Sequence, residues 1–226
     1  RLTGACTATL DAYFMADFLC AVRRRDWEDM VKHMESIKLP PQKRTDNLCQ
    51  FVVGGVDNDR EAVKMNYLSM IRSAKKKIRI QSPYFIPDAS VLDALKTAAA
   101  SGVEIELMIP GIKASFFLDP VTTYYAGQIM EFGAKVYKYR GYIHAKTMTV
   151  DDELCCIGSV NMDMRSLMVD DEICGIFYAN NMVHEYIEIF EKDILNCEPY
   201  IYEQFLARGR KEKFAECVFL PFTPLM

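Results

Sequence analysis

The sequence predicts an α/β fold, a three-layer α/β/α sandwich with a central mixed β-sheet. Strand-like and helix-like segments alternate through residues 48–139, a β-rich stretch follows at 144–178, and a further helix-like segment comes after it. The alternating part predicts parallel strands joined by right-handed crossovers. With 226 residues, 50% of them hydrophobic and 26% charged, the chain can bury a sizeable core and is not expected to be disordered.

The first 47 residues read as a lead-in to this fold. Residues 7–22 are apolar and compatible with a helix, and residues 26–34 continue with helix-forming residues. Pro40 and Pro41 are expected to end this helical stretch before a polar linker at 42–47.

Strands and helices then alternate, and turn residues set their limits. The helix predicted at 59–74 has Val63, Tyr67, Met70, Ile71 and Ala74 on one face. Asp88 is expected to cap the next helix, which Gly102 ends, and Asp119 followed by Pro120 is expected to cap a third, which Gly133 ends. The strands of this part are predicted at 48–53, 77–81, 103–109 and 135–139.

The last part of the chain is predicted to contain strands at 154–157 and 172–178 and a helix at 182–195. That helix would bury Val183, Ile187, Phe190 and Ile194, which recur at helical spacing. Residues 200–226 are expected to form a C-terminal tail, of which residues 214–226 more plausibly cover the core than insert into lipid.

Residues 144–161 carry the pattern of a phosphate-handling site. If residues 144–150 are extended, His144 and Lys146 project from the same side of the strand and share one pocket. Asp151 has the opposite parity and begins a polar turn, so it is expected to orient the loop. Ser159 and Asn161 follow the next strand at matching parity and could bind phosphate oxygens. Taken singly, each of these residues could also be an ordinary strand-end or turn residue.

Taken together, the spacing resembles the signature of the phospholipase D superfamily. It reads His-x-Lys, four residues, Asp, six residues and Gly-Ser-x-Asn, and Glu172 matches a further acidic position. Several segments from about residue 51 to 193 are similar to the second half of bacterial cardiolipin synthases. These are residues 81–88, 101–105, 109–111, 143–147 and 161–166. Asp170 departs from the pattern, because the family usually has Asn there.

The resemblance implies phosphatidyl transfer from one phosphatidylglycerol to another through a phosphohistidine intermediate, with no cofactor and no metal. The implied catalytic residues are His144, Lys146, Asp151, Ser159, Asn161 and Glu172. Such enzymes use two copies of the motif, whereas this chain contains one, so it is expected to supply one of two half-sites. Either role, nucleophile or general acid, remains open for His144.

The resemblance also implies the domain organisation. Residues 1–47 would be a helical remnant and linker that follow a missing first lobe, and 48–199 a phospholipase D-like lobe ahead of the tail. The expected partners are anionic phospholipid (phosphatidylglycerol), the missing N-terminal lobe and a second copy of the chain in a weak homodimer. With a net charge of −4, no nucleic acid is expected.

The full-length enzyme would associate with the cell membrane, with this lobe facing the cytoplasm. The fragment itself is expected to be soluble, because no stretch approaches the roughly 18–20 apolar residues of a membrane span. Two alternatives remain open, a phospholipase D-type phosphodiesterase that uses water as the acceptor and a catalytically incomplete lobe that binds lipid.

The eight cysteines include no Cys-x-x-Cys pair, which makes a zinc site improbable. Cys155 and Cys156 are neighbours on a predicted strand and would point to opposite faces, and several of the others interrupt apolar runs. Reduced, buried thiols are therefore expected.

Overall fold

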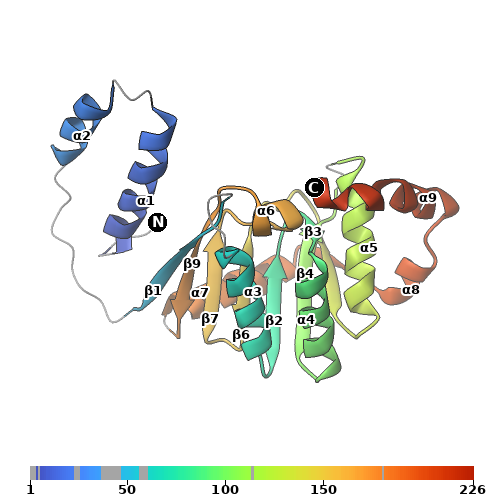
Figure 1. Ribbon diagram of the computed structural model, residues 1–226. Coiled ribbons are helices and arrows are strands. Elements are labelled where there is room, and N and C mark those ends of the chain that lie inside the picture. The colour runs from blue at the N-terminus through green and yellow to red at the C-terminus, as the bar shows by residue number, and fades with distance from the viewer. Residues whose placement is uncertain are drawn as a thin grey trace.

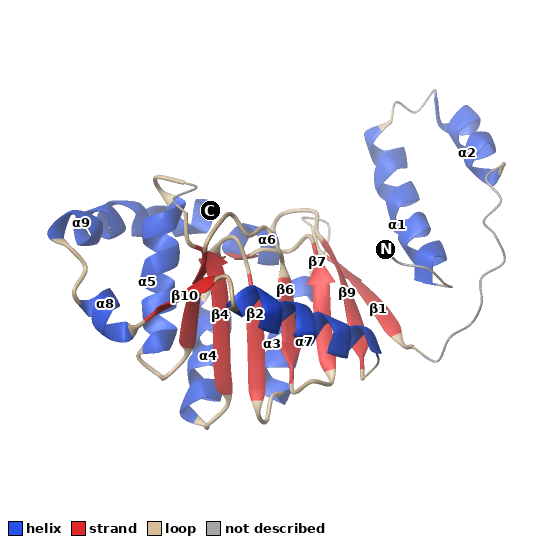
Figure 2. Ribbon diagram, turned by 180° about the vertical axis from the view of Figure 1, so that it is seen from behind, coloured by secondary structure: helices blue, strands red, loops and turns tan. Residues whose placement is uncertain are grey.

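The structure is a computed structural model that describes residues 4, 6–22, 26–36, 47–55, 61–112, 115–179 and 181–226. The expected stop at Pro40 and Pro41 and most of the linker at 42–47 lie outside the described residues. Helices α1 (Cys6–Ala21) and α2 (Trp27–Glu35) match the two helices predicted there. No residue of α1 is buried, and both views show the two helices beside one edge of the sheet (Figures 1 and 2).

The described residues form one eight-stranded mixed sheet, as the alternating pattern predicted. Its order is β1-β9-β7-β6-β2-β4-β5-β10. The neighbours β2, β4 and β5 are parallel, and all other neighbouring strands are antiparallel. The strands are, in that order, Cys49–Val53, Ile173–Tyr178, Leu154–Gly158, Thr147–Val150, Lys77–Gln81, Glu104–Pro110, Lys135–Tyr139 and Cys197–Tyr200. The last of these, β10, was not predicted.

Helices cover both faces of the sheet, which confirms the three layers. Figure 1 shows α3 (Ala62–Ser73), α4 (Ala89–Ala100) and α5 (Leu118–Met130) on one face, and Figure 2 shows α7 (Asn181–Ile194) on the other. The face of α3 that the sequence predicted is buried, with Tyr67 2% and Val63 0% exposed. On α7, Val183 and Phe190 are buried as expected, whereas Ile187 and Ile194 are only half-buried.

One predicted helix cap is confirmed and another is wrong. The Asp88 carboxylate caps α4 by accepting a hydrogen bond from Val91 N at 3.1 Å. Asp119, however, is the second residue of α5. The Ser115 hydroxyl, one turn earlier, accepts from Leu118 N at 3.2 Å, and Asp119 Oδ2 accepts from Ser115 N at 3.1 Å. The carboxylate therefore braces the capping loop from inside the first turn.

The C-terminal tail folds against α5. It consists of α8 (Tyr202–Leu206), α9 (Arg210–Phe219) and a 3₁₀ helix, η2 (Leu220–Leu225). The ring of Phe205 packs so closely on Gly127 of α5 that a Cβ there would lie 2.0 Å from it. An ion pair of 2.6 Å between Arg208 Nε and Glu216 Oε1 joins the link between α8 and α9 to α9. Within the described part of the chain, no helix is long and apolar enough to cross a membrane.

Candidate active site

The candidate site lies at one end of the central strands, where β6 starts and β7 ends. Gly158 N donates to Lys146 O at 3.2 Å, and Ser159 N donates to Ile173 O at 2.9 Å. These bonds place the strand ends that carry Lys146, Ser159 and Glu172 beside one another. The carboxyl ends of the parallel strands β2, β4 and β5 lie at this same end of the sheet, because β6 runs antiparallel to β2.

His144 lies in the loop before β6. The extended run predicted from residue 144 is wrong in its start, because the strand begins at Thr147. The His144 ring is exposed and stacks on Tyr142, with ring centroids 5.5 Å apart and planes 23° apart. The Tyr142 hydroxyl lies 3.1 Å from Nδ1 of His144 and 3.4 Å from the hydroxyl of Tyr84. The Tyr142 hydroxyl, which the Tyr84 hydroxyl contacts in turn, thus holds the Nδ1 side of the His144 ring.

Lys146 is close to His144, as the spacing predicted. Its Nζ donates to the backbone oxygen of His144 at 3.1 Å. Partial burial, followed by the charge of Lys146, lowers the pKa of His144 below 6.5. Burial also lowers the pKa of Lys146, although the carboxylates of Glu172 and Asp163 oppose this effect. A largely neutral imidazole and a cation therefore share the site near pH 7.

Asn161 and Ser159 are held by neighbouring polar groups. Asn161 Nδ2 donates to Ser166 Oγ at 3.1 Å, while its Oδ1 is buried and has no partner among the described residues. The Ser159 hydroxyl accepts from Ile173 N at 3.0 Å and donates to Ile173 O at 3.3 Å. Ser159 therefore has to release that carbonyl before it can donate to a ligand.

Two carboxylates stand behind these groups. Burial raises the pKa of Glu172, and the hydroxyls of Ser159 and Ser166, which lie against its carboxylate, partly offset the rise. Burial likewise raises the pKa of Asp163, whose Oδ1 caps the short helix α6 (Met164–Met168) by accepting from Ser166 N at 2.8 Å. The negative charges near the Lys146 ammonium are thus those of Glu172 and Asp163.

A small second sheet aligns the loops of the site. Strands β3 (Phe85–Ile86) and β8 (Met162–Asp163) pair in parallel, and Met162 N donates to the Ser82 hydroxyl at 3.1 Å. This pairing places the Tyr84 loop beside the Asn161 loop. Residue spacing alone did not assign Tyr84, Tyr142, Asp163 or Ser166 to the site. The only signal for three of them was their position in segments 81–88 and 161–166.

Asp151 lies at the far end of β6 from His144. Its carboxylate accepts from the backbone N–H groups of Lys75, Lys76 and Lys77 at 2.6, 2.7 and 2.8 Å. Burial raises its pKa, but these donors outweigh burial and hold the pKa below 3.8. Asp151 thus orients the loop before β2, whereas its parity predicted that it orients the polar turn that it begins. The structure does not bring it together with the other five residues.

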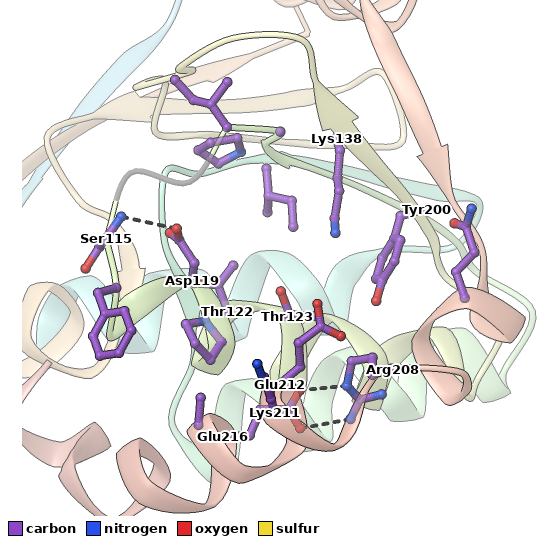
Figure 3. A pocket seen from close by; sticks show the side chains of 18 of the residues that line it. Ser115, Asp119, Thr122, Thr123, Lys138, Tyr200, Arg208, Lys211, Glu212 and Glu216 are labelled. Atoms are coloured by element: carbon purple, nitrogen blue, oxygen red, sulfur yellow. Dashed lines mark hydrogen bonds and ion pairs between the residues drawn. The ribbon is translucent and has the colours of Figure 1, made fainter.

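The chain also has a cavity of about 760 Å³, shown in Figure 3, between the ends of β4 and β5, α5 and the C-terminal helices. None of the six predicted site residues lines it. Pro83, one residue before Tyr84, is the wall residue that links it to the site. Among the described residues, no group of three His, Cys, Asp or Glu side chains is arranged to hold a metal ion.

Sequence comparisons relate this chain to known proteins. A protein-family model described as "Cardiolipin synthase, PLD-like domain" matches residues 67–194. The cardiolipin synthase of Listeria welshimeri is 42% identical over 178 residues, which are 78% of this chain and 37% of the relative. The major cardiolipin synthase ClsA of Bacillus subtilis is 38% identical over the same length and shares. This chain therefore spans little more than a third of the curated relatives that it matches.

Two solved structures share the fold. Nuc, a phospholipase D family member from Salmonella typhimurium, superposes with a TM-score of 0.57 at 18% identity, covering 68% of this chain and 99% of that one. The phosphatidylserine synthase of Haemophilus influenzae superposes with a TM-score of 0.58 at 15% identity, covering 86% of this chain and 50% of that one. At these identities the similarity shows the fold alone, and it confirms the expected fold class.

Proposed function

Because this chain belongs to the cardiolipin synthase family of phospholipase D-like domains, we propose that it supplies half of a site for phosphatidyl transfer between two phosphatidylglycerol molecules. The observation that carries the proposal is the pairing of His144 with Lys146. An exposed imidazole, with Nδ1 held by Tyr142, lies next to a cation at the end of the sheet where the parallel strands have their carboxyl ends. Nε2 is then the ring nitrogen available to a substrate.

The reaction requires two imidazoles. One ring nitrogen forms a bond to phosphorus while the bond from phosphorus to the glycerol oxygen breaks, and the second imidazole gives its proton to the departing alkoxide. That second ring then takes the proton from a primary hydroxyl of another phosphatidylglycerol. Its oxygen attacks phosphorus and the nitrogen–phosphorus bond breaks. Cardiolipin and glycerol are released, and both rings return to their initial states.

His144 is chemically suited to this reaction in either role. A pKa below 6.5 leaves the ring neutral near pH 7, the state that attacks phosphorus. The negative charge of a bound phosphodiester raises the same pKa, which favours the protonated ring that donates to the leaving alkoxide. Formation of phosphohistidine at residue 144 distinguishes the two roles.

Lys146, Asn161 and Ser159 are the proposed donors to the phosphate oxygens. Lys146 provides the charge. The Asn161 amide donates to Ser166 and lies against the Asp163 carboxylate, so one of its N–H groups has to turn toward the phosphate. Ser159 joins them once its hydroxyl turns away from Ile173 O. Each such donor is typically worth about a hundred- to a thousandfold in rate.

A second lobe supplies the other imidazole. The chain contains only two further histidines, His33 and His184, and neither is followed by Lys two residues later. We assign Glu172 to orient the histidine of that second lobe, because Nδ1 of His144 is already held by Tyr142. In the absence of the second lobe, another copy of this chain occupies the vacant position in a weak two-fold dimer, which light scattering at increasing concentration tests.

The reaction takes place at a membrane surface, where phosphatidylglycerol resides, and on its cytoplasmic side. Asp151 contributes by holding the loop before β2 rather than by touching substrate.

Product analysis tests the proposal. The longer protein that contains this chain, incubated with phosphatidylglycerol, should form cardiolipin and glycerol. His144→Ala should abolish both products, whereas the matched variant His184→Ala, which changes an exposed histidine of α7, should leave them unchanged. Phosphatidic acid as the main product would instead indicate hydrolysis, and normal turnover by His144→Ala would exclude the assignment.

A further inference from the structure

Large apolar side chains gather where α5 begins and the chain ends. The ring of Phe116 is 83% exposed, and Leu225 is 72% exposed. The Phe219 ring lies 5.6 Å from the ring of Phe116 and 6.5 Å from that of Phe117, measured between centroids. We call this group the apical aromatic surface. It consists of Phe116, Phe117 and the half-buried Phe219, and the exposed Phe222 and Leu225 follow Phe219 in η2.

This surface differs from ordinary exposure of apolar residues. Single exposed apolar side chains are common on folded proteins, whereas a contiguous group marks an interaction site. Here two segments far apart in the sequence, the loop before α5 and the end of α9, bring their rings into contact and still leave Phe116 largely exposed and Phe117 half-exposed. The contacts therefore build a joint surface without burying it.

The surface lies at the same end of the sheet as the candidate site. Arg165 N donates to Met226 O at 3.2 Å, so the residue after η2 touches α6, whose Ser166 binds Asn161. Both ribbon views show α6, the start of α5 and the C-terminus at this end (Figures 1 and 2). A partner that covers the apical aromatic surface therefore also faces the site.

Basic side chains lie on the helix that carries Phe219. Arg210, Lys211 and Lys213, with Glu212 among them, are exposed in the first turn of α9, which therefore carries a net positive charge. Figure 3 shows Lys211 beside the cavity that Phe116 also lines. Aromatic rings settle at the headgroup level of a bilayer, and neighbouring Lys and Arg residues are attracted to anionic headgroups. An anionic bilayer matches both features.

We infer that the apical aromatic surface inserts into the interface of an anionic phospholipid bilayer and turns the His144 end of the sheet toward the lipid. This inference deepens the proposed function and rests on it, since a site that acts on phosphatidylglycerol must face the layer that contains it. The ring of Phe116 enters the headgroup boundary, and the first turn of α9 lies along the phosphates.

A pair of matched variants tests the inference. Phe116→Asp should weaken binding to vesicles of phosphatidylglycerol and phosphatidylcholine by about tenfold, because an aromatic ring that enters the bilayer is replaced by a charge. Phe132→Asp changes a Phe that is 42% exposed after the last turn of α5, away from the surface, and should bind like the unaltered protein. Equal binding by all three proteins would overturn the inference.

Two further readouts test whether the surface enters the bilayer. Trp27 is the only tryptophan, so Phe116→Trp in a Trp27→Phe background should be quenched by brominated lipids, and absence of quenching would contradict insertion. The contrast between Phe116→Asp and Phe132→Asp must also appear in the longer protein, since its loss there would show that another lobe covers the surface.

Measurements of turnover separate membrane docking from the proposed reaction. With dispersed short-chain phosphatidylglycerol and the chain co-expressed with the first lobe of a family member, Phe116→Asp should retain the turnover of the unaltered pair, and a comparable loss there would place Phe116 in the reaction rather than in docking. Vesicle binding by that pair without any turnover would count against the transfer reaction while supporting the docking surface.

Discussion

The hydroxyl of Tyr142 lies 3.1 Å from Nδ1 of His144, and the two rings stack with their centroids 5.5 Å apart. This contact holds the imidazole in one direction, with Nδ1 beside the Tyr142 hydroxyl. In the neutral ring one nitrogen carries the proton and the other does not, so the partner at Nδ1 influences which form is present.

Tyr142→Phe should therefore lower turnover of the longer enzyme by roughly fivefold, because one hydrogen bond of about 1 kcal/mol is lost while the stacking ring remains. The pH profile of kcat should shift as well, since the surroundings of the His144 ring change. Tyr139→Phe, which alters a nearby tyrosine of β5, is the control. An unchanged rate and pH profile for Tyr142→Phe would contradict the positioning role.

Lys146→Met should raise the pKa of His144. Burial and the Lys146 charge both disfavour the protonated ring, so the folded-state pKa lies below 6.5 and the ring loses its neutral state only as the pH falls through that lower value. Removing the charge removes one of the two causes and moves the titration upward. NMR of the His144 ring measures this, with Lys192→Met as a control on an exposed lysine. A fall in the pKa would contradict the geometry.

Asp151→Ala should reduce the free energy of unfolding by about 1–3 kcal/mol, because three backbone donors lose their acceptor. Glu153→Ala, an exposed change in the same turn, should have little effect. The folded-state pKa of Asp151 is depressed, so its contribution is present above the unfolded value near 3.8 and is lost as the pH falls through the folded value. Unchanged melting with lost substrate binding would instead indicate a role in the site.

Gly158→Ala should be destabilising by about 1–3 kcal/mol, the usual cost of overpacking. A Cβ at this position would lie 2.2 Å from Ile173 O and 2.6 Å from Cys174 Cα, so β7 and β9 would have to separate next to Ser159. At Gly209 a Cβ meets nothing within 4 Å, and Gly209→Ala should change stability by less than about 1 kcal/mol. Equal melting temperatures for the two variants would show that the strand ends adjust freely.

Much of the fold follows from local sequence signals. Strands β2 and β5 begin and end where the sequence predicted, because apolar residues and nearby turn residues define them. The two-residue strands β3 and β8 were missed, since such short elements carry no periodicity and exist only through their mutual pairing. Asp119 satisfied the local rule for a cap, but the loop before α5 offered Ser115 one turn earlier.

The candidate-site residues that the sequence could bring together are those at the ends of neighbouring strands. Lys146, Ser159 and Glu172 meet because β6, β7 and β9 are neighbours. The contact of Tyr142 with His144 was not predictable, because it depends on a loop that leaves the strand direction before Thr147. Asp151 could be separated from the other site residues by parity, and its three backbone donors were visible only in the structure.

The central claim is that this chain holds one half of a two-imidazole site. The most direct measurement is cardiolipin formation from phosphatidylglycerol by the chain alone and by the chain co-expressed with the first lobe of a family member. We expect little or no product from the chain alone, clear product from the pair, and none from the pair that carries His144→Ala. Robust cardiolipin synthesis by the chain alone at concentrations where it is monomeric, or by the His144→Ala pair, would contradict the claim.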